Sequence, residues 1–124
     1  MKKIRNYSAI TAHGDVPARK MVLDLMDRVL QEVDSYQRIR DVMHVEGNLL
    51  HVGVKSWNLE SKRNIYLLGA GKACNAMAQA VCDVLGERIT KGIICVKIKE
   101  EQDHYCNTDV YVGGHPLPNE EGML

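Results

Sequence analysis

The stretch that constrains the fold most begins at residue 65 and reads IYLLGAGKACNAMAQAV. Its first four residues, 65–68, form an unbroken apolar run, which is typical of a strand covered on both faces. Small and apolar residues then recur at helical spacing, and they predict a helix over 72–85. Gly69 and Gly71 lie between the two patterns. The stretch therefore predicts a strand, a tight glycine turn and a helix in direct succession.

Two further strand patterns follow this helix, for which Gly86 is the expected C-cap. The run GIICVKI at 92–98 predicts a second buried strand, and 110–112 predicts a third, short one. Strands that alternate with helices at this spacing indicate βαβ units and a parallel sheet. The expected fold class is α/β: a Rossmann-like three-layer parallel sheet with helices on both faces, left incomplete within these 124 residues.

The N-terminal half is expected to begin with an arm over 1–12 and a long helix over 16–32. Asp15 is a suitable N-cap for this helix, and Pro17 suits its first turn. Apolar residues recur in pairs every four positions and predict one amphipathic stripe, made of Met21, Val22, Leu25, Met26, Val29, Leu30 and Val33. Shorter elements should follow: a helix at 35–43 with Ile39 and Val42 inward, a turn at 46–48, a strand at 49–54 and a polar connector at 55–64.

Composition argues against several classes of protein. Sixteen basic residues balance sixteen acidic ones, whereas non-specific nucleic-acid binding needs a basic face. No apolar run approaches the roughly 18 residues of a membrane span, and no apolar segment follows the basic N-terminus, so a cytoplasmic protein is expected. The four cysteines are interpreted as reduced thiols. The spacing of His104, Cys106 and His115 matches no zinc pattern, so no metal site is predicted.

Both glycine-rich turns, at 69–71 and 113–116, follow strands and should face the same edge of a parallel sheet, where such folds bind ligands. At the first turn, backbone amides of the next helix, its dipole and the Lys72 charge favour an anion, either a phosphate or a carboxylate. The alternative, a purely structural turn with a solvated Lys72, is not excluded by the sequence. At the second turn, two glycines and two prolines should hold His115 in one place, and Asn119 could cap a new helix.

Known phosphate motifs fit the first turn poorly. A P-loop needs a glycine five positions before Gly71, where Tyr66 stands, and a hydroxyl where Ala73 stands. A dinucleotide-binding turn needs a third glycine, and Cys74 occupies that position. An NAD-dependent reductase is therefore a weak alternative.

Three stretches together resemble the N-terminal domain of the glycerate 2-kinase family, of the MOFRL type, whose members are often labelled hydroxypyruvate reductase. They read YLLGAGKACNAMAQAV, LGERITKGIICVK and GGHPLPNEEG. The resemblance covers nearly all of this chain but about the first third of a typical member. It implies that 1–124 is the N-terminal part of the glycerate kinase-like α/β domain, and that a C-terminal domain is absent from this chain.

The resemblance also implies an activity, namely ATP-dependent phosphorylation of glycerate, or a related sugar acid, on its 2-hydroxyl to give 2-phosphoglycerate. The family's catalytic lysine falls on Lys72, and its Gly-His-Pro motif falls on Gly114, His115 and Pro116. Substrate or nucleotide contacts are expected from these three residues and from Gly69, Ala70, Gly71 and Asn119. ATP and Mg²⁺ are the expected cofactors. This chain alone should be inactive, because the family's site lies between two domains.

Two departures from the family leave the acceptor open. Asn119 stands where the family usually has aspartate, and KIKEEQD stands where it tends to have Lys-Tyr-Gly, of which Lys97 matches the lysine. A phosphosugar isomerase or phosphosugar-binding domain remains an alternative, although Ala73 replaces its usual serine. A non-enzymatic domain that binds a sugar acid or a phosphorylated ligand, and reports it to a partner, remains another. The expected partners are a sugar acid, a nucleotide, the C-terminal domain of the same protein and, in a homodimer, a second copy of the chain, with no nucleic acid and no membrane.

Overall fold

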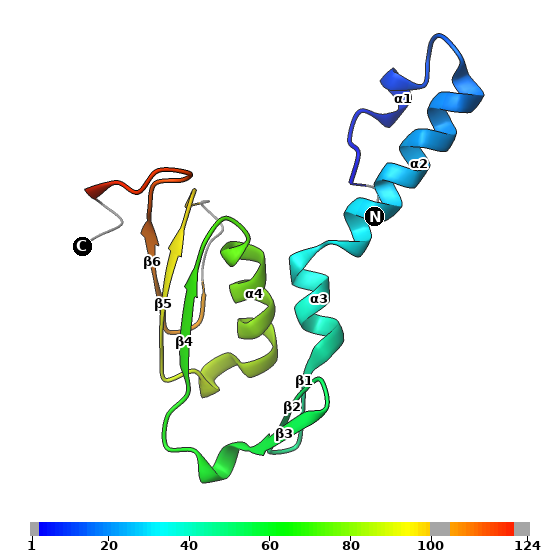
Figure 1. Cartoon of the computed structure of the whole chain (residues 1–124). Helices are drawn as coiled ribbons and strands as arrows, with labels where there is room; N and C mark the ends of the chain where they lie inside the picture. The colour runs from blue at the N-terminus through cyan, green and yellow to red at the C-terminus, as the bar shows by residue number, and fades with distance from the viewer. Residues whose placement is uncertain (1–2, 100–104, 121–124) are drawn as a thin grey trace. The chain divides into compact units, whose positions relative to one another are not determined.

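The computed structural model describes residues 3–99 and 105–120 (Figure 1). The chain divides into two compact units, Met1–Asp34 and Ser35–Leu124. The described part of the first unit is helical, whereas the second unit combines helices with an antiparallel and a parallel sheet.

The first unit is built on α2, which runs over Val16–Glu32 as predicted. The Asp15 carboxylate accepts a hydrogen bond from the Ala18 amide at 3.0 Å, so the expected N-cap is confirmed. A short helix, α1 (Tyr7–Ile10), lies within the expected arm. The buried Asp27 carboxylate accepts hydrogen bonds from the Lys3 and Ile4 amides at 2.7 and 3.0 Å, and so holds the arm against α2.

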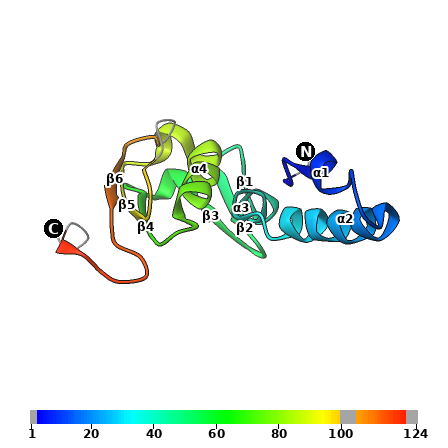
Figure 2. The same ribbon diagram turned by 90° about the horizontal axis from the view of Figure 1, so that it is seen from above.

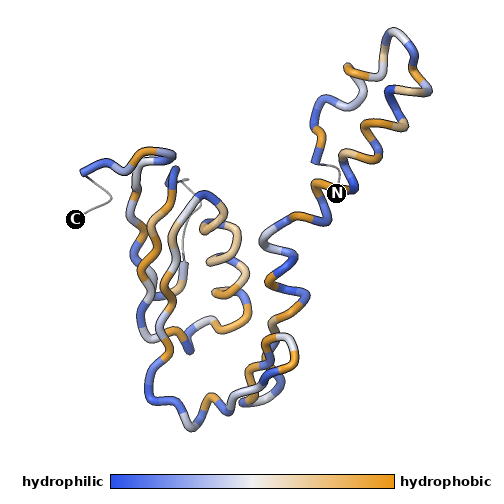
Figure 3. Tube along the Cα trace, in the orientation of Figure 1, coloured by the Kyte–Doolittle hydropathy of each residue, from blue (hydrophilic) through white to orange (hydrophobic). Residues whose placement is uncertain are grey.

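The arm packs on the side of α2 that carries Leu23 and Asp27, which are the buried residues of this helix. Within this unit the apolar stripe on the other side stays exposed, from 44% at Leu30 to 70% at Met21. Figure 3 shows apolar residues along the whole length of α2. The arm therefore uses a buried carboxylate, rather than the apolar stripe, as its anchor.

The second unit begins with α3 (Ser35–Val42) and an antiparallel three-stranded sheet. The strands are β1 (Met43–Glu46), β2 (Leu49–Val52) and β3 (Lys55–Asn58), paired in that order. The expected polar connector at 55–64 is therefore wrong, since it contains β3 and the 3-10 helix η1 (Leu59–Ser61). Trp57 pairs with Leu50 across the sheet, so strand pairing overrides the polar composition. Ile39 packs against the core as expected, whereas Val42 is 47% exposed.

The predicted parallel sheet is confirmed. It contains β4 (Tyr66–Ala70), β5 (Lys91–Val96) and β6 (Thr108–Val112), in the order β4-β5-β6 with both pairs parallel. The helix α4 (Cys74–Leu85) links β4 to β5 and ends at Gly86, whose φ of +53° suits its C-cap role. A short 3-10 helix, η2 (Gly86–Arg88), completes the link.

The core of this unit lies between α4 and one face of the parallel sheet. Ile89, Ile94 and Val96 are its most completely buried large side chains, and Ala78, Cys82 and Leu85 of α4 join them. Figures 1 and 2 both place α4 between this sheet and α3. Among the described residues of this unit, the other face of the sheet is uncovered. Leu68 is 77% exposed, so within the described residues β4 is covered on one face, and not on the two faces expected from its apolar run.

Candidate functional site

The first glycine turn is shaped by two different requirements. A Cβ on Gly69 would lie 2.5 Å from the Cys74 sulfur, so only a glycine lets the start of α4 approach β4 this closely. Gly71 has a φ of +111°, a conformation that side chains disfavour. Its amide donates to the Cys95 carbonyl at 3.0 Å, which ties the turn to the end of β5. Both glycines are therefore needed for the sharp passage from strand to helix.

The N-terminus of α4 opens directly from this turn. Ala73 is its N-cap residue and offers no side-chain cap, and the Cys74 amide closes the turn on the Gly71 carbonyl at 3.1 Å. Helix α4 begins two residues later than predicted, because Lys72 and Ala73 belong to this turn. The Lys72 side chain is exposed. A helix terminus without a side-chain cap, with a lysine beside it, is suited to an anion.

The second turn, after β6, is held by its own hydrogen bonds. The Gly113 amide donates to the Val96 carbonyl at 2.9 Å, and the Gly114 amide donates to the Asn119 side-chain oxygen at 2.7 Å. A Cβ on Gly114 would collide with the Leu117 carbonyl. His115 is exposed on this turn and joins Pro116 through a cis peptide bond. Asn119 thus caps its own turn, and the new helix expected after it falls largely on 121–124, outside the described residues.

The two turns lie at the same edge of the sheet, as predicted from the parallel order of the strands. Lys72 follows the carboxyl end of β4 and His115 follows the carboxyl end of β6, with β5 between them. In Figure 1 this is the upper edge of the sheet. Gly69, Ala70 and Gly71 lie at this edge with Lys72, and Gly114, Pro116 and Asn119 lie there with His115.

One residue at this edge was not predicted from the sequence. The Asn75 side chain, in the first turn of α4, donates to the Ile98 carbonyl at 3.2 Å and so connects the glycine turn to the segment after β5. That segment carries Lys97 and Lys99, both exposed. A polar residue in the first turn of a helix that follows a glycine turn is the signal that could have identified Asn75.

The thiols nearby are poor nucleophiles. Burial, and secondarily the nearby Cys95, raises the pKa of Cys74, and burial together with the neighbouring Cys106 raises the pKa of Cys82 to about 12. Both sulfurs therefore stay protonated near neutral pH. In residues 3–99 and 105–120, no group of three histidine, cysteine or acidic side chains is arranged to hold a metal ion, and His104 lies outside this part of the chain.

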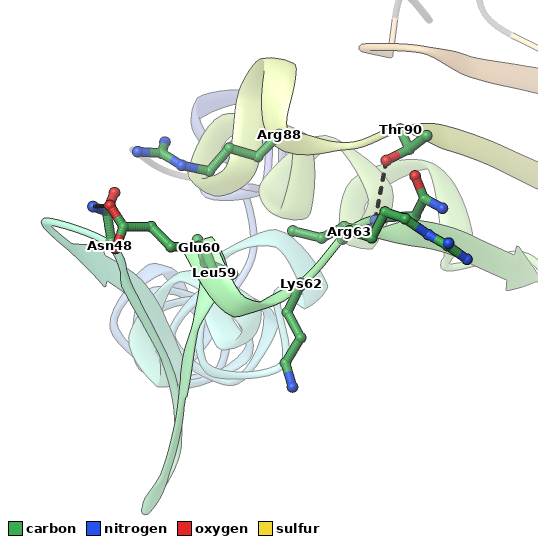
Figure 4. Close-up of a pocket in the computed structure, with 9 residues that line it drawn as sticks. Asn48, Leu59, Glu60, Lys62, Arg63, Arg88 and Thr90 are labelled. Carbon is green, nitrogen blue, oxygen red and sulfur yellow. Dashed lines mark hydrogen bonds between the residues drawn. The ribbon is translucent and has the colours of Figure 1, made fainter.

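A pocket of about 260 Å³ lies at the opposite edge of the sheet, near the amino ends of β4 and β5 (Figure 4). Lys62, Arg63 and Arg88 contribute to its lining, and Figure 4 shows the Lys62 and Arg63 side chains extending in different directions. Asn48 donates to the Glu60 carboxylate at 2.6 Å at its rim. Since its cations do not converge, this pocket is a weaker anion site than the glycine turn.

The described residues contain no helix with the length and apolar character that a membrane span requires.

Comparison with known proteins agrees with this architecture. Residues 21–124 match the family described as Domain of unknown function (DUF4147). A D-glycerate 2-kinase of Thermotoga maritima is 36% identical over 56 residues, which are 45% of this chain and 13% of that protein. A glycerate 2-kinase of Pyrococcus horikoshii is 26% identical over 106 residues, which are 86% of this chain and 23% of that protein.

Two solved structures share the fold. A crystal structure of a P. horikoshii OT3 protein aligns with a TM-score of 0.66 and 26% identity, over 84% of this chain and 23% of that one. A T. maritima glycerate kinase aligns with a TM-score of 0.59 and 21% identity, over 85% of this chain and 22% of that one. This chain thus spans less than a quarter of the length of the relatives it matches. The resemblance read from its motifs is confirmed: the chain belongs to the DUF4147 family, the N-terminal domain of the glycerate 2-kinase family.

Proposed function

We propose that this chain supplies a phosphate-binding edge of the parallel sheet in an ATP-dependent glycerate 2-kinase. This enzyme would phosphorylate glycerate, or a related sugar acid, on its 2-hydroxyl. The observation that carries the proposal is the turn at Gly69–Gly71. It leads into α4 without a side-chain cap and sets Lys72 at the carboxyl edge of a parallel sheet. Glycerate is proposed as the phosphate acceptor because the two relatives are named as glycerate 2-kinases.

The chemistry needs little more from this edge than position and charge. Phosphoryl transfer is accelerated mostly by aligning the reactants and by neutralising charge on the transferred group. Lys72, the α4 amides and the α4 dipole would all attract a phosphate or the carboxylate of the sugar acid. His115, held on the second turn at the same edge, would contact the substrate or the nucleotide, and Asn119 would keep that turn closed through the Gly114 amide.

ATP and Mg²⁺ belong to this proposal. Mg²⁺ prefers several oxygen ligands, and the described residues present no cluster of acidic side chains at this edge. The described residues do not form a magnesium site by themselves.

The test is turnover in a polypeptide of full length. A chimera in which this chain replaces the matched segment of the P. horikoshii glycerate 2-kinase should form ADP and 2-phosphoglycerate from Mg-ATP and glycerate. Lys72→Met should lower kcat/KM by about 10²–10³-fold, because a charge that stabilises the transferred group is lost. Lys62→Met, at the opposite edge, is the matched control and should keep the activity of the parent.

Two results would contradict the proposal. Equal activity of the Lys72→Met and Lys62→Met variants would show that Lys72 does not contribute to the reaction. A folded chimera that binds 2-phosphoglycerate but forms no ADP would favour a phosphosugar-binding domain instead.

A further inference from the structure

Two of the four cysteines meet in the core of the second unit. Cys82 lies on α4 and is 7% exposed, whereas Cys106 lies in the connection that leads into β6 and is half-buried. They are 24 residues apart in sequence, yet the Cys106 thiol donates a hydrogen bond to the Cys82 carbonyl at 4.0 Å. Both pack in the cluster that contains Leu85, Ile94 and Val96. The fold therefore brings two reduced thiols from distant segments into contact.

The two sulfur atoms are themselves neighbours. Burial is the main cause that raises the pKa of Cys82, and a hydrogen bond between the Cys82 and Cys106 side chains raises it further. A hydrogen bond from the Cys106 backbone acts in the opposite direction. With the contact to the Cys82 carbonyl, three hydrogen bonds join the same two residues. A disulfide requires two cysteines whose side chains meet at short range, and this pair fulfils that requirement.

The other two cysteines are not arranged in this way. The residues on either side of Cys95 in β5 are buried beneath α4, so Cys95 lies on the outward face of the sheet, away from that helix. Cys74, at the start of α4, is buried on the inner side, and the sheet separates it from Cys95. The structure describes all four cysteines, and of these Cys82 and Cys106 are the two with thiols in contact.

We propose that Cys82 and Cys106 form a redox-modification site, at which a low-molecular-weight disulfide oxidises the two thiols to an intramolecular disulfide. In reducing compartments, protein disulfides are mostly transient and respond to redox conditions, so this site would be reversible. The inference depends on a contact within the core. It is independent of the kinase proposal, whose residues lie around the two glycine turns.

The exchange consumes one oxidant molecule and proceeds in two steps. Cys106 is the more exposed of the pair, and its thiolate attacks one sulfur of the small disulfide, so that one small thiol leaves and a mixed disulfide remains on Cys106. The Cys82 sulfur then attacks the Cys106 sulfur, and the second small thiol leaves. The two cysteine protons end on the two leaving sulfurs, so one disulfide is reduced to two thiols. The raised pKa of Cys82 makes the second step the slower one.

The new bond would close a loop around β5. Between Cys82 and Cys106 lie η2 and β5, so the bond would fasten the second half of α4 to the segment that enters β6. A cross-link of this kind stabilises mainly by restricting the unfolded chain. Lys72 and the turn at Gly69–Gly71 lie at the other end of α4, so oxidation should stabilise this unit without closing the edge that carries Lys72.

Exchange with glutathione, followed by intact mass, tests the site without any need for turnover. The reduced 124-residue chain is equilibrated with mixtures of oxidised and reduced glutathione, and the reaction is stopped with acid. The main product should be about 2 Da lighter than the reduced chain, and peptide mapping should join Cys82 to Cys106. The midpoint of thermal unfolding should rise by about 10 °C, as expected for a closed loop of roughly 25 residues.

Two controls separate a site built by the fold from random oxidation. Cys106→Ser should abolish the lighter product, whereas Cys95→Ser, a matched half-buried position on the outward face, should leave its yield unchanged. In urea, where the contact is lost, the preference for joining Cys82 to Cys106 should disappear, and other pairings of the four cysteines should form as well.

Three results would overturn the inference. Accumulation of the mixed disulfide on Cys106, with no lighter product, would show that Cys82 does not reach it. An equal yield of the lighter product from Cys106→Ser would assign the bond to another pair. The same mixture of pairings in urea and in a native chain that unfolds cooperatively would mean that the fold does not select this pair.

Discussion

Gly69 and Cys74 lie so close that a Cβ on the glycine would stand 2.5 Å from the cysteine sulfur. This contact sets the distance between β4 and the first turn of α4, and with it the position of the turn that carries Lys72. The glycine is thus part of the packing between strand and helix as well as part of the turn.

Replacing Gly69 with alanine should destabilise the chain by about 1–3 kcal/mol, the usual cost of overpacking a tight contact. Urea unfolding followed by circular dichroism measures the change. In a Cys74→Ala background, Gly69→Ala should lower the free energy of unfolding by much less than it does in the parent, because the sulfur that a Cβ would meet is gone. Equal losses in both backgrounds would mean that the cost of Gly69→Ala does not come from Cys74.

Cys82 should resist alkylation in the folded chain. Burial and the neighbouring Cys106 raise its pKa to about 12, so at pH 8 roughly one molecule in 10⁴ carries the reactive thiolate. Iodoacetamide labelling, located by mass spectrometry, should be at least about 100-fold slower at Cys82 in native chain than in urea. Comparable rates in the two conditions would contradict the burial of this thiol in the core beside Cys106.

The hydrogen bond from the Tyr36 hydroxyl to the Asp83 carboxylate, 2.6 Å long, joins α3 to α4 and should make stability depend on pH. It is the main cause of the lowered pKa of Asp83 and of the raised pKa of Tyr36. The Asp83 contribution is present above its ordinary pKa of 3.8 and is lost as the pH falls through the lower folded value. The Tyr36 contribution is present below pH 10 and is lost as the pH rises through the higher folded value.

Tyr36→Phe should therefore lower the urea midpoint slightly at neutral pH, and the difference from the parent should vanish at both pH extremes. The matched control is Tyr66→Phe, whose exposed hydroxyl lies on the outward face of β4. A parent–variant difference that stays constant down to pH 2 would show that Asp83 is not the partner.

His51 should be replaceable with a gain in stability. Its ring stacks on His44 with centroids 4.8 Å apart, and its Nε2 atom is buried without a hydrogen-bond partner in the described structure. His51→Phe keeps an aromatic ring and removes the unsatisfied nitrogen, so the free energy of unfolding should rise by about 1 kcal/mol. His44→Phe, at the exposed partner, serves as control and should bring no such gain.

The elements that could be predicted from sequence are those with local signals. The bounds of α2 follow from the Asp15 cap, Pro17 and helical periodicity, and the parallel strands follow from apolar runs bounded by glycine. By contrast, β1 and β3 are four-residue strands whose pairing with β2 creates them, and periodicity over four residues carries little information.

Burial was harder to predict than the elements themselves. An apolar run such as 65–68 indicates a strand, but it does not say which face is covered within a given stretch of chain. At the carboxyl edge of the parallel sheet, the glycines, Lys72 and His115 were predictable from turn chemistry. Asn75 and the Asn119–Gly114 hydrogen bond were not, because each depends on where two segments meet in space.

The central claim is that the glycine turn and the start of α4 form an anion site, and a titration of the ¹⁵N-labelled 124-residue chain with 2-phosphoglycerate tests it most directly. Amide shifts should concentrate on residues 71–76 and on the turn at 113–115, and Lys72→Met should weaken them. Shifts that concentrate instead at Asn48, Lys62 and Arg88, around the pocket at the opposite edge, would contradict the account.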